Sequence, residues 1–140
     1  MHAVSPNTGE IIWSSENIGT KNYIGENSPT LGGNGIAYAA GGNSIYALSV
    51  KDGRKIWELP FTLEERRVFY DYVTYYQGIV YTVANSPHGI HAVEANTGKK
   101  LWFFRTANPH TSYLSIGKNG NLYVGNSPNL LYAIHWKSGV

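Results

Sequence analysis

Three tryptophans recur along the chain at an almost constant spacing. Trp13, Trp57 and Trp102 are 44 and 45 residues apart, and each follows a glycine by four positions and an alanine by ten. The windows read AVSPNTGEIIW, ALSVKDGRKIW and AVEANTGKKLW, and a fourth, AIHWKSGV, begins at Ala133 and stops before its tryptophan. A fixed period of this length indicates a repeat protein, in which each unit buries its apolar face against the next.

Each repeat contains four short apolar segments separated by turn residues. In the first complete repeat these segments are residues 28–31, 36–40, 44–50 and 54–59. Turn sequences such as G-N-G and K-D-G lie between them, and their Asn-Gly and Asp-Gly pairs supply the positive φ that tight hairpins need. β-branched and aromatic residues fill the segments themselves. The pattern predicts one antiparallel meander of four strands per repeat.

Four antiparallel strands at a period of about 40–50 residues are typical of one blade of a β-propeller. Leucine-rich, ankyrin and tetratricopeptide repeats are shorter and need helical segments, for which this chain shows no pattern. We therefore expect an all-β fold of four-stranded blades, about three repeats long, in a single open or partial propeller. Its expected parts are the end of one blade (1–14), two whole blades (28–61 and 70–105) and an incomplete blade (112–140).

Three blades are too few to close a ring, because propellers usually have about four to eight. We expect the chain to be a segment of a longer propeller, with additional blades from the rest of that chain. The alternative is self-association, in which the strand Ile11–Ser14 of one copy adds to the last blade of another. The N-terminus shows neither the basic start nor the apolar core of a secretory signal.

The eleven-residue window, with Ala first, Gly seventh and Trp last, resembles the tryptophan-docking motif of the pyrroloquinoline quinone (PQQ)-like repeat propellers. The resemblance covers the whole chain and implies a propeller of usually about eight blades. That family includes quinoprotein dehydrogenases and a non-enzymatic lipoprotein of the outer-membrane β-barrel assembly machinery, so the resemblance favours an extracytoplasmic or periplasmic location. The third position of the motif, often Asp in the family, is Ser5, Ser49, Glu94 or His135 here.

The motif has a physical explanation in the packing of a large ring on small residues. A tryptophan on an outer strand buries its flat face against a neighbouring blade only where that blade offers nearly bare backbone, and its indole N–H then needs a carbonyl. Trp136 lies outside this register and could be exposed. The residues that we expect to dock neighbouring blades are Ala3, Gly9, Trp13, Ala47, Gly53, Trp57, Ala92, Gly98 and Trp102.

Composition excludes several classes of function. The chain has no cysteine, which excludes a disulfide scaffold, a cysteine-ligated zinc site and a thiol enzyme. Its net charge is only +2, and its basic residues are scattered apart from Arg66 and Arg67, so we expect no nucleic-acid binding. No apolar stretch approaches the ~20 residues of a membrane-spanning helix, so we expect no membrane span.

The histidines form no recognisable catalytic or metal-binding pattern. His2 and His91 occupy the position before the motif alanine that Tyr46 and Tyr132 take in the other repeats, so we interpret them as partly buried packing residues. His88 and His91 are three residues apart, a spacing that does not by itself bring two ring nitrogens to one metal ion. We therefore predict no metal site and no catalytic residues.

The longest connection between blades carries charged and aromatic side chains. It opens on the propeller face that the other outer-to-inner connections reach, which is the usual ligand side. One hypothesis is a polar, aromatic-rimmed surface for a protein, peptide or glycan; the other, which we favour for the loop itself, is a solvated segment whose charges pair weakly. The residues of the hypothetical partner surface are Tyr23, Arg66, Arg67, Tyr70, Asp71, Arg105, Asn108 and His110.

Two classes of function remain. The first is a non-catalytic scaffold or binding module for a protein, peptide or glycan, which needs rigidity and exposed Tyr, Arg and Asn side chains. The second, which the resemblance implies, is a fragment of a PQQ- and calcium-dependent dehydrogenase, with Asp71 as the first acid to test. The vicinal cysteine pair that often covers the quinone in that family is missing here. We therefore predict the scaffold, with no cofactor.

Overall fold

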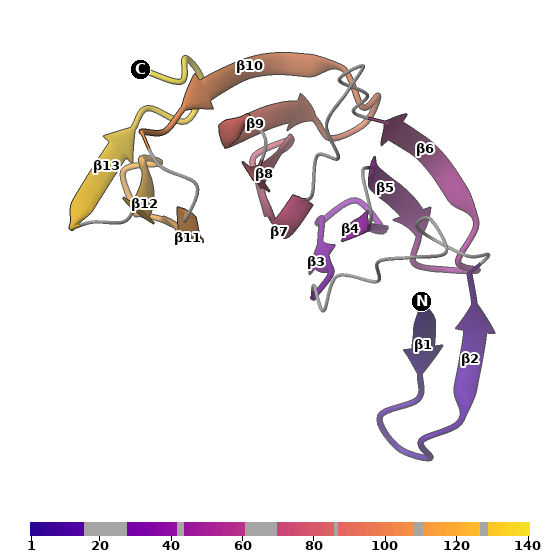
Figure 1. The fold of residues 1–140 in the computed structure, drawn as a ribbon. Helices are drawn as coiled ribbons and strands as arrows, with labels where there is room; N and C mark the ends of the chain where they lie inside the picture. The colour runs from indigo at the N-terminus through magenta and orange to yellow at the C-terminus, as the bar shows by residue number, and fades with distance from the viewer. Residues whose placement is uncertain (16–27, 42–43, 61–69, 86, 108–110, 127–128) are drawn as a thin grey trace.

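The computed structural model describes residues 1–15, 28–41, 44–60, 70–85, 87–107, 111–126 and 129–140. All of the regular secondary structure in these residues is β-strand, arranged in four antiparallel sheets that follow one another along an arc (Figure 1). The expectation of an all-β partial propeller is therefore confirmed. None of the described residues belongs to a helix long and apolar enough to cross a membrane.

Each sheet is a meander in which every strand pairs with its neighbour in sequence. The first sheet consists of β1 (His2–Val4) and β2 (Ile11–Ser14), and the second of β3 (Thr30–Leu31), β4 (Ile36–Gly41), β5 (Ser44–Ser49) and β6 (Lys55–Pro60). The third consists of β7 (Tyr70–Tyr76), β8 (Ile79–Asn85), β9 (His88–Glu94) and β10 (Lys100–Arg105), and the fourth of β11 (Thr111–Ile116), β12 (Leu122–Asn126) and β13 (Leu130–Ile134). The strands β3, β7 and β11 lie on the inner side of the arc, and β2, β6 and β10 lie on its outer side.

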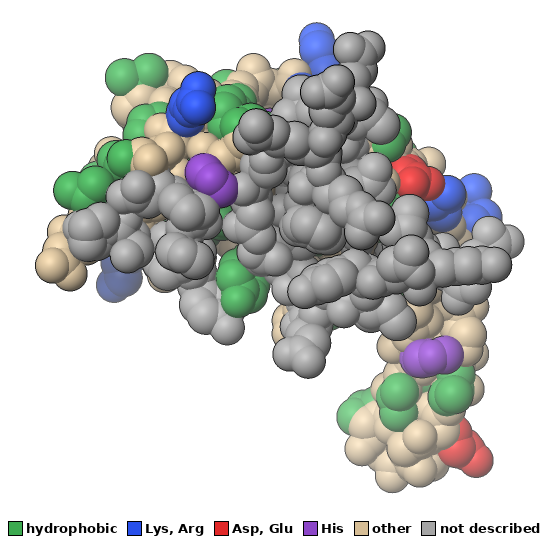
Figure 2. Space-filling model, viewed as in Figure 1, with side chains coloured by type: hydrophobic (Ala, Val, Ile, Leu, Met, Phe, Trp, Pro, Cys, Tyr) green, Lys and Arg blue, Asp and Glu red, His purple; other side chains and the backbone are tan. Residues whose placement is uncertain are grey.

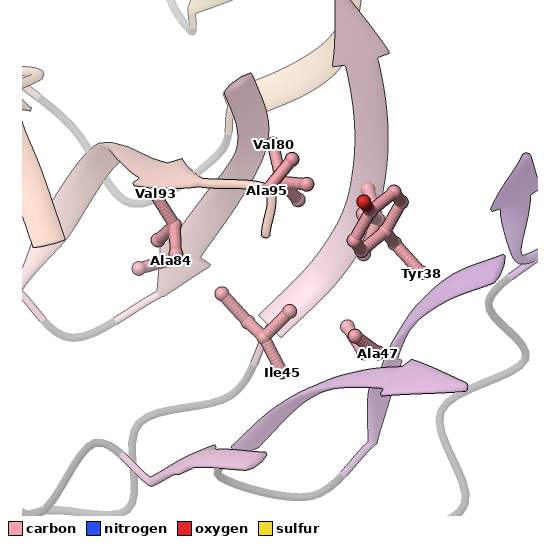
Figure 3. Close-up of a cluster of buried hydrophobic side chains, with 9 residues drawn as sticks. Tyr38, Ile45, Ala47, Val80, Ala84, Val93 and Ala95 are labelled. Atoms are coloured by element: carbon pink, nitrogen blue, oxygen red, sulfur yellow. The ribbon is translucent and has the colours of Figure 1, made fainter. Parts of the chain in front are cut away.

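Two apolar clusters fill the spaces between successive sheets. The first, between the second and third sheets, includes the fully buried side chains of Tyr38, Ile45 and Val80 (Figure 3). The second, between the third and fourth sheets, includes Tyr81 and Leu122. Because consecutive residues of a strand point to opposite faces, β8 contributes Val80 to one cluster and Tyr81 to the other. The third sheet is therefore apolar on both faces.

A small residue between two large rings occupies the middle of each four-stranded sheet. Ala47 on β5 pairs with Tyr38 on β4 and with Trp57 on β6. Because the alanine methyl group is short, the two rings meet over it with their centroids 6.0 Å apart. In the third sheet the rings of Tyr81 and Trp102 lie 5.8 Å apart across the corresponding alanine. The motif alanine thus makes room for ring packing within its own sheet.

Each motif tryptophan packs on the glycine of the following repeat, and not on the glycine of its own. A Cβ atom added to Gly53 would overlap the six-membered ring of Trp13, and one added to Gly98 would lie 3.0 Å from the ring of Trp57. The third motif tryptophan covers Gly139 in the same way. These glycines have φ values of 70–75°, so they combine a left-handed backbone with a surface that only a residue without a side chain can offer.

The indole N–H groups of two tryptophans extend these contacts with hydrogen bonds. Trp13 Nε1 donates to the carbonyl oxygen of Val50 at 2.8 Å, and Trp57 Nε1 donates to that of Ala95 at 2.9 Å. Both acceptors lie three residues before the glycine that the same ring covers. Ring and N–H therefore contact one turn of the next sheet, and both indole donors have an acceptor.

The seam between the third and fourth sheets uses a tyrosine hydroxyl instead. Tyr81 donates to the carbonyl oxygen of Trp136 at 3.0 Å, and the indole N–H of Trp102 has no hydrogen-bond partner among the described residues. In the second sheet the amide of Asn34 donates a hydrogen bond to the hydroxyl of Tyr38, which is equivalent to Tyr81. The turn residue equivalent to Asn34 in the third sheet is Gln77, whose amide donates to Tyr76 instead. Burial raises the pKa of Tyr81, so its hydroxyl keeps the proton that it donates.

Trp136 is half-buried, so the expectation that it could be exposed is not met. Its ring meets Tyr76 edge to face, with centroids 5.5 Å apart, and a Cβ added to Gly120 would lie 2.8 Å from it. The Nζ of Lys137 lies 4.9 Å from the ring centroid, within the range of a cation–π contact. Trp136 therefore packs on the same seam as Trp102, from a different position in the repeat.

His91 is a partly buried packing residue at the position that Tyr46 occupies in the preceding repeat, as expected. The same expectation is wrong for His2, which is exposed and lies within hydrogen-bond distance of the Ser14 hydroxyl. His91 pairs with Thr82 on β8 and with Phe103 on β10, and the rings of His91 and Phe103 are 4.4 Å apart. Burial, with a smaller contribution from the charge of Lys100, lowers the pKa of His91 to about 4. The imidazole is therefore neutral at physiological pH.

We expect Gly53→Ala to destabilise the fold more than Gly9→Ala. Both glycines have φ near +74° and the same place in the motif, but nothing lies within 4 Å of a Cβ added to Gly9. Backbone strain of about 1–2 kcal/mol is common to both variants, whereas Gly53→Ala also overpacks the ring of Trp13, at a cost of about 1–3 kcal/mol. Urea unfolding measures the difference, and equal free energies of unfolding for the two variants would contradict the packing.

We expect the free energy of unfolding to fall as the pH is lowered from 6.5 towards 4, because the unfolded chain binds a proton at His91 more readily than the folded chain does. The complete loss would be about 3 kcal/mol. His91→Tyr, which copies the preceding repeat, should flatten this dependence. Chemical denaturation over a series of pH values measures it, and an unchanged slope in the variant would show that another group is responsible.

Candidate functional site

Most of the hypothetical partner surface lies outside the described residues, namely Tyr23, Arg66, Arg67, Asn108 and His110. Tyr70 and Asp71 begin β7, but only their backbone is described. Arg105 is the last residue of β10 and its side chain is exposed. That these side chains form one surface therefore stays a prediction.

The segment that follows β10 is tied to two other strands. The N–H of Thr106 donates to the carbonyl oxygen of His88 at 3.1 Å, within the third sheet. The N–H of Ala107 donates to the hydroxyl of Tyr132, on β13 of the fourth sheet, at 3.4 Å. These bonds fix the backbone immediately after Arg105. The main-chain position of Arg105, from which its exposed side chain extends, is therefore well defined.

Buried polar side chains occur at this same end of the third and fourth sheets. Thr106 and Asn126 are buried, and the buried Nδ1 atom of His88 has no hydrogen-bond partner among the described residues. Sequence reasoning missed Thr106 and Asn126, because Asn126 opens the stretch N-S-P-N, which is typical of an exposed turn. The burial of Asn126 is therefore a feature of the folded chain that this local pattern does not predict.

The inner strands form a pocket of about 250 Å³ that the sequence analysis did not anticipate. Thr30 lines it from β3, Ser28 from just before that strand, Tyr72 and Thr74 from β7, and Leu114 from β11. Its other described lining residues are Pro29 and Val73, so the part of its wall that the structure describes carries hydroxyl and apolar groups without a charged side chain. Hydroxyls on strands are common in any β-protein, which is why these positions gave no signal in the sequence.

The chemistry of the pocket favours neutral polar ligands. A hydroxyl both donates and accepts a hydrogen bond, so it can match either the N–H or the C=O group of a peptide, or the hydroxyls of a sugar. Apolar neighbours such as Leu114 add contact area without fixing a charge. The arrangement can therefore bind and orient a ligand.

The described parts of the chain hold no cluster of three or more His, Asp or Glu side chains that could bind a metal ion. His88 and His91 both lie on β9, and because they are three residues apart their side chains project to opposite faces of the sheet. His91 packs against Phe103 instead. These two histidines therefore do not act together.

Comparisons with known proteins bear on both the fold and the family. The family model described as "Outer membrane protein assembly factor BamB" matches residues 1–140. A comparison with curated proteins found no match. Among solved structures, the chain is similar to the computationally designed Ika8 protein, with 12% identity and a TM-score of 0.72 over 96% of this chain and 39% of that one.

Two natural proteins of known structure are also similar. BamB from Moraxella catarrhalis has 15% identity and a TM-score of 0.71, over 94% of this chain and 38% of that one. The quinohemoprotein alcohol dehydrogenase ADHIIG from Pseudomonas putida HK5 has 23% identity and a TM-score of 0.68, over 91% of this chain and 21% of that one. The chain thus spans less than half the length of each of these proteins, and at such identities the likeness shows the fold alone.

The tryptophan motif at a constant period, the antiparallel sheets along an arc and the family match over every residue agree. The chain belongs to the PQQ-like repeat β-propeller family, whose matching model is that of the outer membrane protein assembly factor BamB.

Proposed function

We propose that this chain is part of a non-catalytic propeller scaffold of the cell envelope, which binds a protein, peptide or glycan partner. The description of the matching family model supports this role, because it names an assembly factor. The proposed units are residues 1–14, 28–61, 70–105 and 112–140, and further blades would come from a longer chain or from self-association. The hypothetical loop surface around Arg105 belongs to the same proposal.

The observation that carries the proposal is the pocket between the inner strands, whose described lining residues are hydroxyl-bearing or apolar. Thr30 and Thr74 belong to different sheets, and the seam between those sheets contains the contact of Trp57 with Gly98. Hydroxyl groups that are fixed before a ligand arrives lose little side-chain entropy when it binds. A scaffold needs this combination of rigid walls and a few polar groups.

A second candidate is a fragment of a quinoprotein dehydrogenase that depends on PQQ and calcium, which the likeness to the alcohol dehydrogenase favours. Calcium takes about six to eight oxygen ligands, usually with several carboxylates. The described residues do not fit this ion, because the pocket supplies hydroxyls without a carboxylate. The side chain of Asp71, the first acid to test for this candidate, lies outside the described part of the chain. The scaffold therefore remains the first candidate.

We expect calcium and PQQ together to give no dye-linked oxidation of ethanol above the rate with PQQ alone. The quinone absorbance spectrum should also stay that of the free cofactor, because no cofactor site is proposed. Both are measured in one spectrophotometric titration of the full chain. Dye reduction that depends on the protein and is lost in Asp71→Asn would contradict the scaffold and favour the dehydrogenase.

We expect a neutral ligand to perturb the pocket in an NMR titration of the isotope-labelled chain. The probes are chitotriose and the capped peptide Thr-Val-Thr-Val, and the amides of Thr30 and Thr74 report binding. Thr74→Val removes one hydroxyl at almost constant volume and should weaken binding by about tenfold, as expected for one lost hydrogen bond. Ser115→Ala, on the exposed opposite face of β11, should leave the affinity unchanged. If neither probe shifts the pocket amides, the pocket is not the binding site.

A further inference from the structure

We propose that the outer edge of β10 is a docking site, at which an extended acidic segment of a partner protein adds as a further antiparallel strand. This edge is separate from the inner pocket and shares only Arg105, the last residue of β10, with the hypothetical loop surface. The strand-addition site and the proposed function can therefore fail independently.

β10 is the outermost strand of the third sheet. It pairs with β9 alone among the described strands, and it lies on the outer side of the arc (Figure 1). The free side of such a strand presents backbone N–H and C=O groups in the spacing that another strand needs. Main-chain hydrogen bonds then supply affinity, and the side chains at alternate positions decide which partner is accepted.

Phe103, in the middle of β10, is an aromatic side chain already held in place. A Cβ added to Gly89 would lie 2.6 Å from its ring, and the ring of His91 lies 4.4 Å from it on the same face. The side chain is nevertheless 39% exposed. Because the ring packs on bare backbone before any partner arrives, its burial by an added strand costs little conformational entropy.

The equivalent edge in the preceding repeat is protected against strand addition. The position of Phe103 is taken there by Glu58, which accepts hydrogen bonds from Lys55 at 2.7 Å and from Ser44 at 3.1 Å. The position of Arg105 is taken by Pro60, which has no N–H to donate. A charge on the edge and a proline are two common ways of blocking edge-to-edge pairing. β10 has an exposed phenylalanine and an arginine at these two positions.

The charges along β10 determine the kind of partner. Lys99, Lys100 and Arg105 are exposed at the two ends of the strand, on either side of Phe103 and Leu101, of which Leu101 is 43% exposed. Figure 2 shows hydrophobic and basic side chains beside one another over this part of the molecule. Arg105 forms no ion pair with any described carboxylate. The edge is thus apolar in the middle and positive at both ends.

A second β10 strand does not fit the edge. Antiparallel pairing of two β10 strands would place Lys100 of one copy near Arg105 of the other, and parallel pairing would place like positions together. Like charges on neighbouring strands are destabilising. The fitting strand has apolar residues opposite Leu101 and Phe103 and carboxylates opposite Lys100 and Arg105, because opposite charges both speed encounter and set the register.

The capped peptide Glu-Thr-Val-Thr-Val-Glu tests this proposal on the full chain. In the antiparallel direction its first Glu meets Arg105 and its first valine meets Phe103. Its second valine and last Glu lie beside the irregularity of β10 between Lys100 and Trp102, close to Leu101 and Lys100. NMR titration of the isotope-labelled chain should give saturable shifts on β10 and its neighbours, and these shifts should persist in Thr74→Val, which alters the separate inner pocket. Phe103→Glu, which copies β6, and Arg105→Glu should each weaken binding by about tenfold or more.

Charge exchange makes the test independent of any loss of stability in the variants. The peptide Lys-Thr-Val-Thr-Val-Glu should restore binding to Arg105→Glu, and Glu-Thr-Val-Thr-Val-Lys, which reverses the charges, should not. Ile56→Glu, at the position of Leu101 on β6, should bind the first peptide as the unaltered chain does. Absence of saturable shifts on β10, equal effects of Ile56→Glu and Arg105→Glu, or a dimer that Phe103→Glu dissociates would each overturn the proposal.

Discussion

The contact between a motif tryptophan and the backbone of the following sheet is the interaction on which the rest of this structure depends. A small twisted sheet cannot bury both faces by itself, so successive sheets have to supply each other's core. Trp57 makes that coupling specific: it packs beside Tyr38 over Ala47, covers Gly98 in the next sheet and donates its N–H to the carbonyl of Ala95. One side chain thus joins ring packing, backbone geometry and a satisfied buried donor.

A constant seam allows the surfaces around it to differ between repeats. At the seam between the third and fourth sheets, the hydroxyl of Tyr81 replaces the indole N–H as the donor to the carbonyl of the following sheet. The turn before β8 carries Gln77 there, and the two sheets still pack on each other. On the outer strands, the position after the motif tryptophan is Glu58 on β6, which pairs with Lys55, and the exposed Phe103 on β10. On the inner side, hydroxyls from separate sheets meet in one pocket. The binding sites that we propose therefore lie at positions that the tryptophan motif leaves free to vary.

The fold was predictable from the sequence because its determinants are local, whereas most of the site was not. The period, the Asn-Gly and Asp-Gly turns and the strand composition all lie within one repeat. The sequence did not predict on which glycine Trp57 packs, because Gly53 and Gly98 both lie in motif windows. Only the arrangement of the sheets places the ring on Gly98. For the same reason Trp136 and the pocket residue Thr74 gave no signal: their neighbours come from other sheets. Among the predicted partner residues only the side chain of Arg105 is described.

A double-mutant cycle of Trp57→Leu and Gly98→Ala tests the central contact most directly, because each change removes or perturbs one side of it. The free energy of unfolding is measured for the four proteins under identical conditions. If the ring lies on the glycine, Gly98→Ala costs less once the ring is gone, with a coupling free energy of about 1 kcal/mol or more. Additive effects, equal to within about 0.3–0.5 kcal/mol, would show that the two residues do not pack on each other.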